Sequence, residues 1–90
     1  MIKVKLTEAM NTYNPALYTL KEKGYEVSAV VYEEVEETRW IATKEDVVVI
    51  GFNPLSLLGL VILTEQYGES WQEYNKIDLY KDIIANSESL

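Results

Sequence analysis

The chain has 90 residues, which is enough for one domain and too few for two. It contains no cysteine and no histidine, so disulfides, thiolate nucleophiles, cysteine-bound zinc and histidine acid–base chemistry are excluded. Fifteen acidic residues against eight basic ones give a net charge of −7, and because such a surface repels phosphate backbones we expect no direct nucleic-acid binding.

The first predicted element is the segment MIKVKL, in which apolar and basic residues alternate. Its apolar positions are Ile2, Val4 and Leu6. A period of two is typical of a strand with one buried face, and we expect a strand over about 2–6. The segment is also basic: residues 1–24 carry a net charge of +2, and the rest of the chain carries −9.

A helix is predicted next, over about 15–23. Asn14 can cap this helix, and Pro15 fits its first position, where a missing N–H group costs nothing. Gly24 follows the last turn, which is the usual place for a helix to end.

Three segments rich in β-branched and aromatic residues follow, and we expect them to form strands. They cover about 25–33, 37–43 and 46–51. The connections between them are short, which favours an antiparallel meander. The third segment, VVVIG, is apolar on both faces, as a central strand covered on both sides would be.

The second predicted helix covers about 54–67 and begins with the same aromatic–Asn–Pro device as the first. Its apolar stretch, 55–63, is too short to cross a membrane, which takes about 20 residues. Apolar residues surround this helix, so more than one face must be covered, and Gly59 suggests a close backbone approach. We expect a core helix. The alternatives are a groove for another partner, or a seam between two copies of the chain that is formed by Leu57, Leu60 and Val61.

Residues 69–90 predict a short C-terminal helix that closes an edge of the sheet. The prediction depends on the rough helical spacing of Ile77, Tyr80, Ile83 and Ile84. Trp71 and Tyr74 lie among acidic residues and form either an interaction face or packing under the second helix. We expect one globular domain over 1–85, followed by a disordered tail over 86–90.

The expected fold class is therefore α+β. It has an antiparallel sheet of three strands, or four if the N-terminal strand joins. Both longer helices cover one face of that sheet, and the short C-terminal helix follows them.

The most conspicuous polar feature is an acidic run at the turn between the first two strands of the meander. Together with two acids near the C-terminal helix, it is the surface that we predict to dock a basic partner: Glu33, Glu34, Glu36, Glu37, Glu69 and Glu73. Glutamates at a turn are more naturally solvated than catalytic, because catalysis requires one carboxyl group with a raised pKa in a pocket. The glycines are isolated and form no phosphate loop. We expect no catalytic residue, no cofactor and no metal site.

These features favour a small acidic bacterial or phage protein that works in the cytoplasm, since no signal peptide is visible. The predicted function is a non-catalytic protein-interaction module that docks a basic partner and, in its sharpest form, acts as an inhibitor or immunity-type protein. The alternative is a homodimeric structural or accessory domain whose important surface is the apolar helix.

Overall fold

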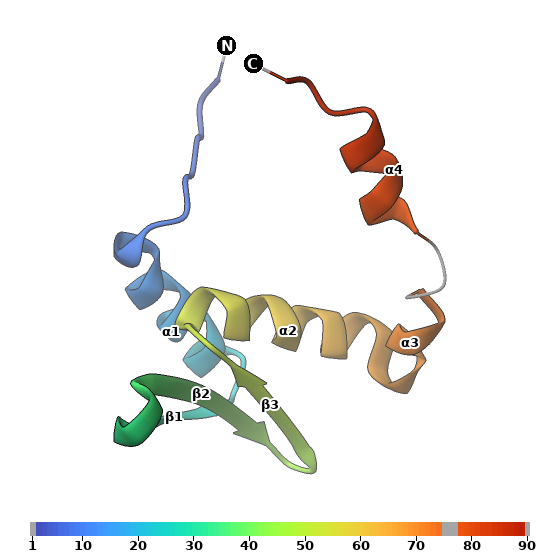
Figure 1. The fold of residues 1–90 in the computed structure, drawn as a ribbon. Coiled ribbons are helices and arrows are strands. Elements are labelled where there is room, and N and C mark those ends of the chain that lie inside the picture. Colours follow the sequence, from blue (N-terminus) through green and yellow to red (C-terminus); the bar gives the residue numbers. More distant parts are fainter. Residues whose placement is uncertain (1, 75–77, 90) are drawn as a thin grey trace.

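The computed structural model describes residues 2–74 and 78–89. Its centre is a three-stranded antiparallel sheet in the order β1-β2-β3, and two helices, α1 and α2, lie on one face of that sheet (Figure 1). The strands are β1 (Glu26–Tyr32), β2 (Glu37–Lys44) and β3 (Val47–Gly51). The helices are α1 (Tyr13–Glu22), α2 (Pro54–Tyr67), α3 (Trp71–Tyr74) and α4 (Leu79–Ala85). The predicted α+β class is confirmed.

Three short 3₁₀ turns connect these elements: η1 (Met10–Thr12), η2 (Glu33–Val35) and η3 (Gly68–Ser70). Each of the two strand connections contains a residue with a left-handed backbone conformation, Glu36 with φ 51° and Glu45 with φ 55°. Because the connections are tight, each strand pairs with its neighbour in sequence, as expected for a meander.

The strand order corrects one prediction. The doubly apolar strand, β3, was expected at the centre of the sheet, but β2 is the central strand and β3 lies at an edge. In the register, Ile41 of β2 faces Ser28 on one side and Ile50 on the other. Strand β3, whose sequence is typical of the middle of a sheet, therefore has one edge without a neighbouring strand in the described chain.

The core lies between the sheet and the two longer helices. It consists of Leu20, Tyr25, Ala42, Val49, Leu57 and Val61. Helix α2 comes very close to the end of β3, because a Cβ atom added to Gly51 would lie only 2.9 Å from the backbone nitrogen of Leu57. The close approach expected at Gly59 is wrong, since nothing lies within 4 Å of a Cβ atom added there.

The two aromatic–Asn–Pro sequences behave differently. The Asn53 side chain caps α2 by accepting a hydrogen bond from the backbone nitrogen of Ser56 at 2.8 Å. The cap predicted at Asn14 is wrong, because η1 leads directly into α1 and Asn14 lies inside the helix. Helix α1 therefore begins at Tyr13, directly after η1, and no side chain of the described residues caps it.

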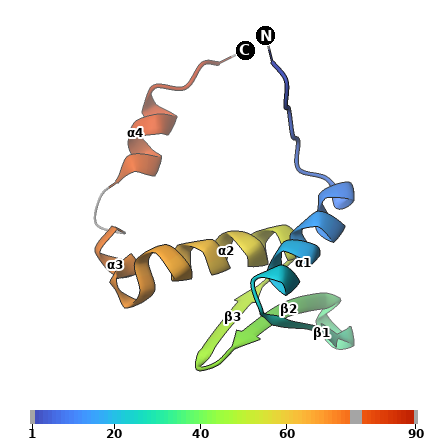
Figure 2. The same ribbon diagram turned by 180° about the vertical axis from the view of Figure 1, so that it is seen from behind.

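Both ends of the chain extend away from the sheet and the two longer helices (Figures 1 and 2). The strand expected over 2–6 is not formed, and these residues are exposed and pair with no strand in the described chain. Helix α4 does not close an edge of the sheet, because all of its residues are exposed. Ile77, which contributed to the prediction of this helix, lies outside the described residues.

The chain is expanded for its size. Its radius of gyration is 15.8 Å, whereas a compact domain of this length has about 12 Å. Its accessible surface is 8043 Å², whereas a compact monomer of equal mass exposes about 5,400 Å². Much apolar surface that a closed monomer would bury is therefore open to solvent.

Candidate functional site: a groove at the free edge of the sheet

An apolar groove of about 360 Å³ runs beside the free edge of β3, between that strand and the C-terminal half of α2. We call it the edge groove. It is lined by Val48, Val49, Ile50, Leu60, Leu63, Thr64 and Trp71. Only Val49 among these residues belongs to the buried core, so the groove is a continuation of the core toward solvent.

The end of the groove is built by the turn that follows α2. Gly68 ends α2 with φ 56°, a left-handed conformation that glycine adopts without cost. The chain then enters α3, and the rings of Tyr67 and Tyr74 lie 4.5 Å apart between their centroids, which holds α3 against the end of α2. This arrangement places Trp71, half exposed, at the mouth of the groove.

Acidic residues stand next to the groove in the chain. Glu45 and Asp46 form the turn that begins β3. Glu69 and Glu73 flank Trp71, and both are exposed. The groove is therefore lined by apolar residues, and acidic residues flank two of its lining segments in the sequence. This combination favours a ligand with apolar and basic groups.

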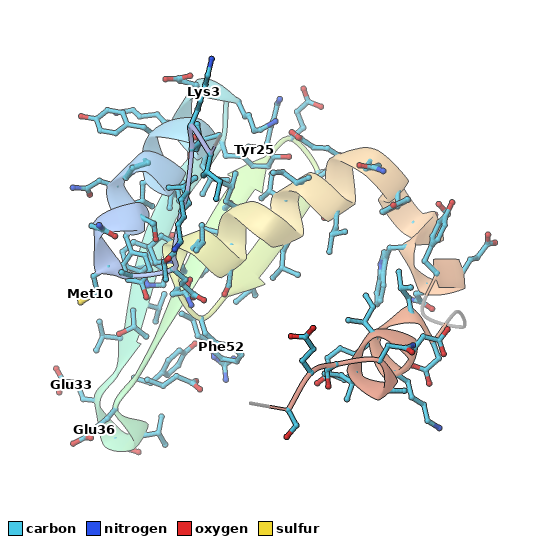
Figure 3. All side chains as sticks on the ribbon, turned by 90° about the horizontal axis from the view of Figure 1, so that it is seen from above. Lys3, Met10, Tyr25, Glu33, Glu36 and Phe52 are labelled. Atoms are coloured by element: carbon cyan, nitrogen blue, oxygen red, sulfur yellow. The ribbon has the colours of Figure 1, made fainter. Side chains whose placement is uncertain are left out.

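The six predicted docking acids do not form one surface. Glu33, Glu34 and Glu36 lie at the tip of the β1–β2 hairpin, and Figure 3 shows Glu33 and Glu36 far from α3. Glu37 is engaged by Arg39, whose Nε atom donates to Oε2 of Glu37 at 2.9 Å. Only Glu69 and Glu73 are close in the chain to the edge groove.

The three residues of the predicted dimer seam also separate. Leu57 and Val61 are completely buried in the core of the chain itself. Leu60 is exposed and lines the edge groove. Of the three, Leu60 is the one that a partner can reach.

The structure also contains a polar cluster that the sequence did not predict. The Nζ atom of Lys23 lies 2.8 Å from Oε1 of Glu65, and the Tyr25 hydroxyl donates to Oε2 of Glu65 at 3.3 Å. Lys44 donates from Nζ to the Lys23 carbonyl oxygen at 2.7 Å and lies over the Tyr25 ring. The cluster joins the end of α1, α2 and the end of β2, so its role is to hold these elements together.

The contacts and the burial of this cluster shift three pKa values. The hydrogen bond with Lys23 lowers the pKa of Glu65, and the hydrogen bond with Glu65 raises the pKa of Lys23. Burial raises the pKa of Tyr25. Nothing in the sequence indicates Glu65 as the partner of Lys23, because 42 residues separate them.

Among residues 2–74 and 78–89, no group of three or more acidic side chains could hold a metal ion. In the same part of the chain, no polar or charged residue is buried, and no helix is long and apolar enough to span a membrane. No family model, no curated protein and no solved structure matches this chain. The candidate site is therefore defined by its geometry alone, which is that of an apolar groove beside an edge strand.

Proposed function

We propose that this chain is a non-catalytic protein-interaction module of the cytoplasm and that the edge groove is its binding site. The ligand is an extended segment of a partner protein in which apolar and basic residues alternate. The observation that supports this proposal is the free edge of β3 lying directly beside an apolar groove.

An edge strand offers a row of unpaired backbone N–H and C=O groups, and an extended segment can pair with them as an added strand. Side chains of such a segment point alternately to the two faces of the sheet. Those on the helix side would enter the groove between Leu60, Leu63 and Trp71. Backbone pairing supplies affinity in this mode, and the groove supplies selectivity for apolar side chains.

The acidic character of the chain favours a basic partner. With 15 acidic and 8 basic residues, the chain attracts positively charged segments and speeds their approach, chiefly at low salt. The glutamates of the β1–β2 hairpin tip then contribute by long-range attraction, while Glu69 and Glu73 act close to the groove. In its sharpest form, such a module blocks a basic surface of its partner, as an inhibitor or immunity-type protein does.

A short peptide of alternating valine and lysine tests this proposal, with the fluorescence of Trp71 as the readout. We expect the peptide to shift the Trp71 emission and to protect amides of β3 from hydrogen exchange. Leu63→Lys, at a half-exposed groove position, should weaken binding at least tenfold while the fold is kept. The Trp71→Phe variant identifies the reporter, since the half-buried Trp40 then supplies the remaining emission.

A peptide of alternating valine and glutamate is the matched control. It has the same strand-forming pattern and the opposite charge, so it should bind at least tenfold more weakly. Equal binding of both peptides, or no binding of either one to a monomeric form of the chain, would contradict the proposal.

A further inference from the structure

We infer that the occupant of the edge groove is residues 2–6 of a second copy of this chain, which add to β3 as a fourth strand. The inference rests on the proposed function, because it names the partner of the same groove. Each copy would give its segment to the other, so that the contact closes as a two-fold dimer.

The donated segment has the properties of a strand that lacks a sheet. Its apolar side chains are almost completely exposed, with Ile2 at 79%, Val4 at 77% and Leu6 at 81%. They alternate with Lys3 and Lys5, so one face of the extended segment is apolar and the other is basic. A segment of this pattern gains most by pairing with a sheet edge and burying its apolar face.

The accepting strand has the complementary property. β3 is apolar on both faces, which is typical of a strand in the middle of a sheet, yet it forms an edge. Its exposed residues Val48 and Ile50 are β-branched, with no charge or proline that would protect the edge from pairing. Addition of a fourth strand would make β3 the internal strand that its sequence describes.

A second copy fits better than the segment of the same chain. Figures 1 and 2 show that the N-terminal segment leaves α1 in the direction away from the sheet, with the helices between the segment and β3. Figure 3 shows Lys3 beside α1 and away from α3. Helix α3 carries the groove residue Trp71. The segment is therefore presented outward, toward another molecule.

Charge and area support the same occupant. Lys3 and Lys5 make the segment basic, and residues 25–90 of the accepting copy carry a net charge of −9, which is a favourable pairing of signs. The chain exposes roughly 2,600 Å² more surface than a compact monomer of its mass. A stable interface needs about 800 Å² from each partner. The excess, which is shared among the groove, the N-terminal segment and α4, is larger than that area.

Sedimentation equilibrium of the full chain tests the inference. We expect a species of twice the chain mass of 10.4 kDa. The paired substitution Val4→Gln and Leu6→Gln keeps the charge of the segment, and Ile50→Lys puts a charge on the accepting edge. Each of the two variants should give a folded monomer, since all three side chains are at least half exposed, and the dissociation constant should rise more than tenfold.

The control variant is Val31→Lys, which places the same charge on the opposite edge strand, at a residue that is 63% exposed. It should dimerise like the unmodified chain. Mixing the two monomeric variants provides a second test, because the Ile50→Lys chain keeps an intact segment and the other chain keeps an intact groove. Their mixture should form a heterodimer through one of the two contacts, which misfolded chains would not do.

A monomeric unmodified chain, a dimer that survives both changes, or equal disruption by Val31→Lys would each overturn the inference. Failure of the inference is distinguishable from failure of the proposed function. If the valine–lysine peptide binds the groove and the chain stays monomeric, the groove serves another protein. If the peptide does not bind and the chain stays monomeric, both proposals are wrong.

Discussion

Lys23 and Glu65 form an ion pair with 2.8 Å between Nζ and Oε1, and it joins the end of α1 to the C-terminal half of α2. Tyr25 donates its hydroxyl to the other oxygen of the same carboxylate. Two elements that are distant in the sequence are thereby fixed on one face of the sheet. Because α2 forms one wall of the edge groove, this pair also contributes to the shape of the groove.

The ion pair makes stability depend on pH at both ends of the scale. The pKa of Glu65 is lowered from 4.5 in the folded chain. The contribution of Glu65 to folding stability is therefore present above pH 4.5 and is lost as the pH falls through its pKa in the folded chain. The pKa values of Lys23 and Tyr25 are raised from 10.5 and 10.0. Their contribution is present below pH 10 and is lost as the pH rises through the folded values.

Glu65→Gln should therefore lower the melting temperature near neutral pH, and its effect should shrink as the pH falls below 4.5 and through the lowered pKa of Glu65. Thermal melts from pH 3 to pH 11 would measure this difference. Glu69→Gln is the matched control, because Glu69 is exposed beyond the end of α2 and should change little. An equal loss in both variants across the whole range would show that the pair is not a specific contact.

The glycines at positions 51 and 59 should respond to alanine with opposite signs. Gly51→Ala places a Cβ atom 2.9 Å from the backbone nitrogen of Leu57 and 3.0 Å from its Cα atom, so it should destabilise the fold by about 1–3 kcal/mol. Gly59→Ala meets nothing within 4 Å, and it should stabilise α2 by about 1 kcal/mol. Urea unfolding of both variants gives the two free energies of unfolding directly.

The two aromatic–Asn–Pro sequences provide another matched comparison. Asn53→Ala removes the side chain that accepts from the Ser56 backbone nitrogen, and it should cost about 1 kcal/mol. Asn14→Ala, inside α1, should stay within about 0.5 kcal/mol of the unmodified chain. Similar losses in the two variants would mean that Asn14 caps a helix after all.

Introducing an aspartate into α2 should distinguish core positions of this helix from accessible ones. Leu57→Asp buries an unpaired carboxylate where no part of the side chain is exposed, and a loss on the order of 4 kcal/mol or more should unfold the chain. Leu60→Asp, at a groove position that is 40% exposed, should keep the fold and weaken occupation of the edge groove. Circular dichroism distinguishes the two outcomes.

Reversing the charge of two sets of glutamates distinguishes their contributions to peptide association. Replacing Glu33, Glu34 and Glu36 with lysine should slow association of the valine–lysine peptide several-fold at low salt, and the effect should disappear at high salt. Replacing Glu69 and Glu73 should have the larger effect, because they flank Trp71. If neither set changes the rate or its salt dependence, acidic steering is wrong.

Local patterns identified most elements of this fold. The predicted range of the second helix, 54–67, is confirmed, because Asn53, Pro54 and Gly68 are boundary signals that act within a few residues. The three strands were found from β-branched residues and short turns. The acidic docking surface could not be predicted as one face, since placing the hairpin tip and α3 relative to each other requires the whole tertiary arrangement.

By itself, the sequence determined the α+β class, the antiparallel meander, the negative charge and the apolar character of α2, because each depends on composition or on periodicity along one segment. Only the tertiary structure decided that β3 is an edge strand, that Leu57 and Val61 are buried while Leu60 is open, and that Glu65 meets Lys23. These features depend on which segments pack together. Packing is set by the summed burial of residues far apart in the chain, which no local pattern encodes.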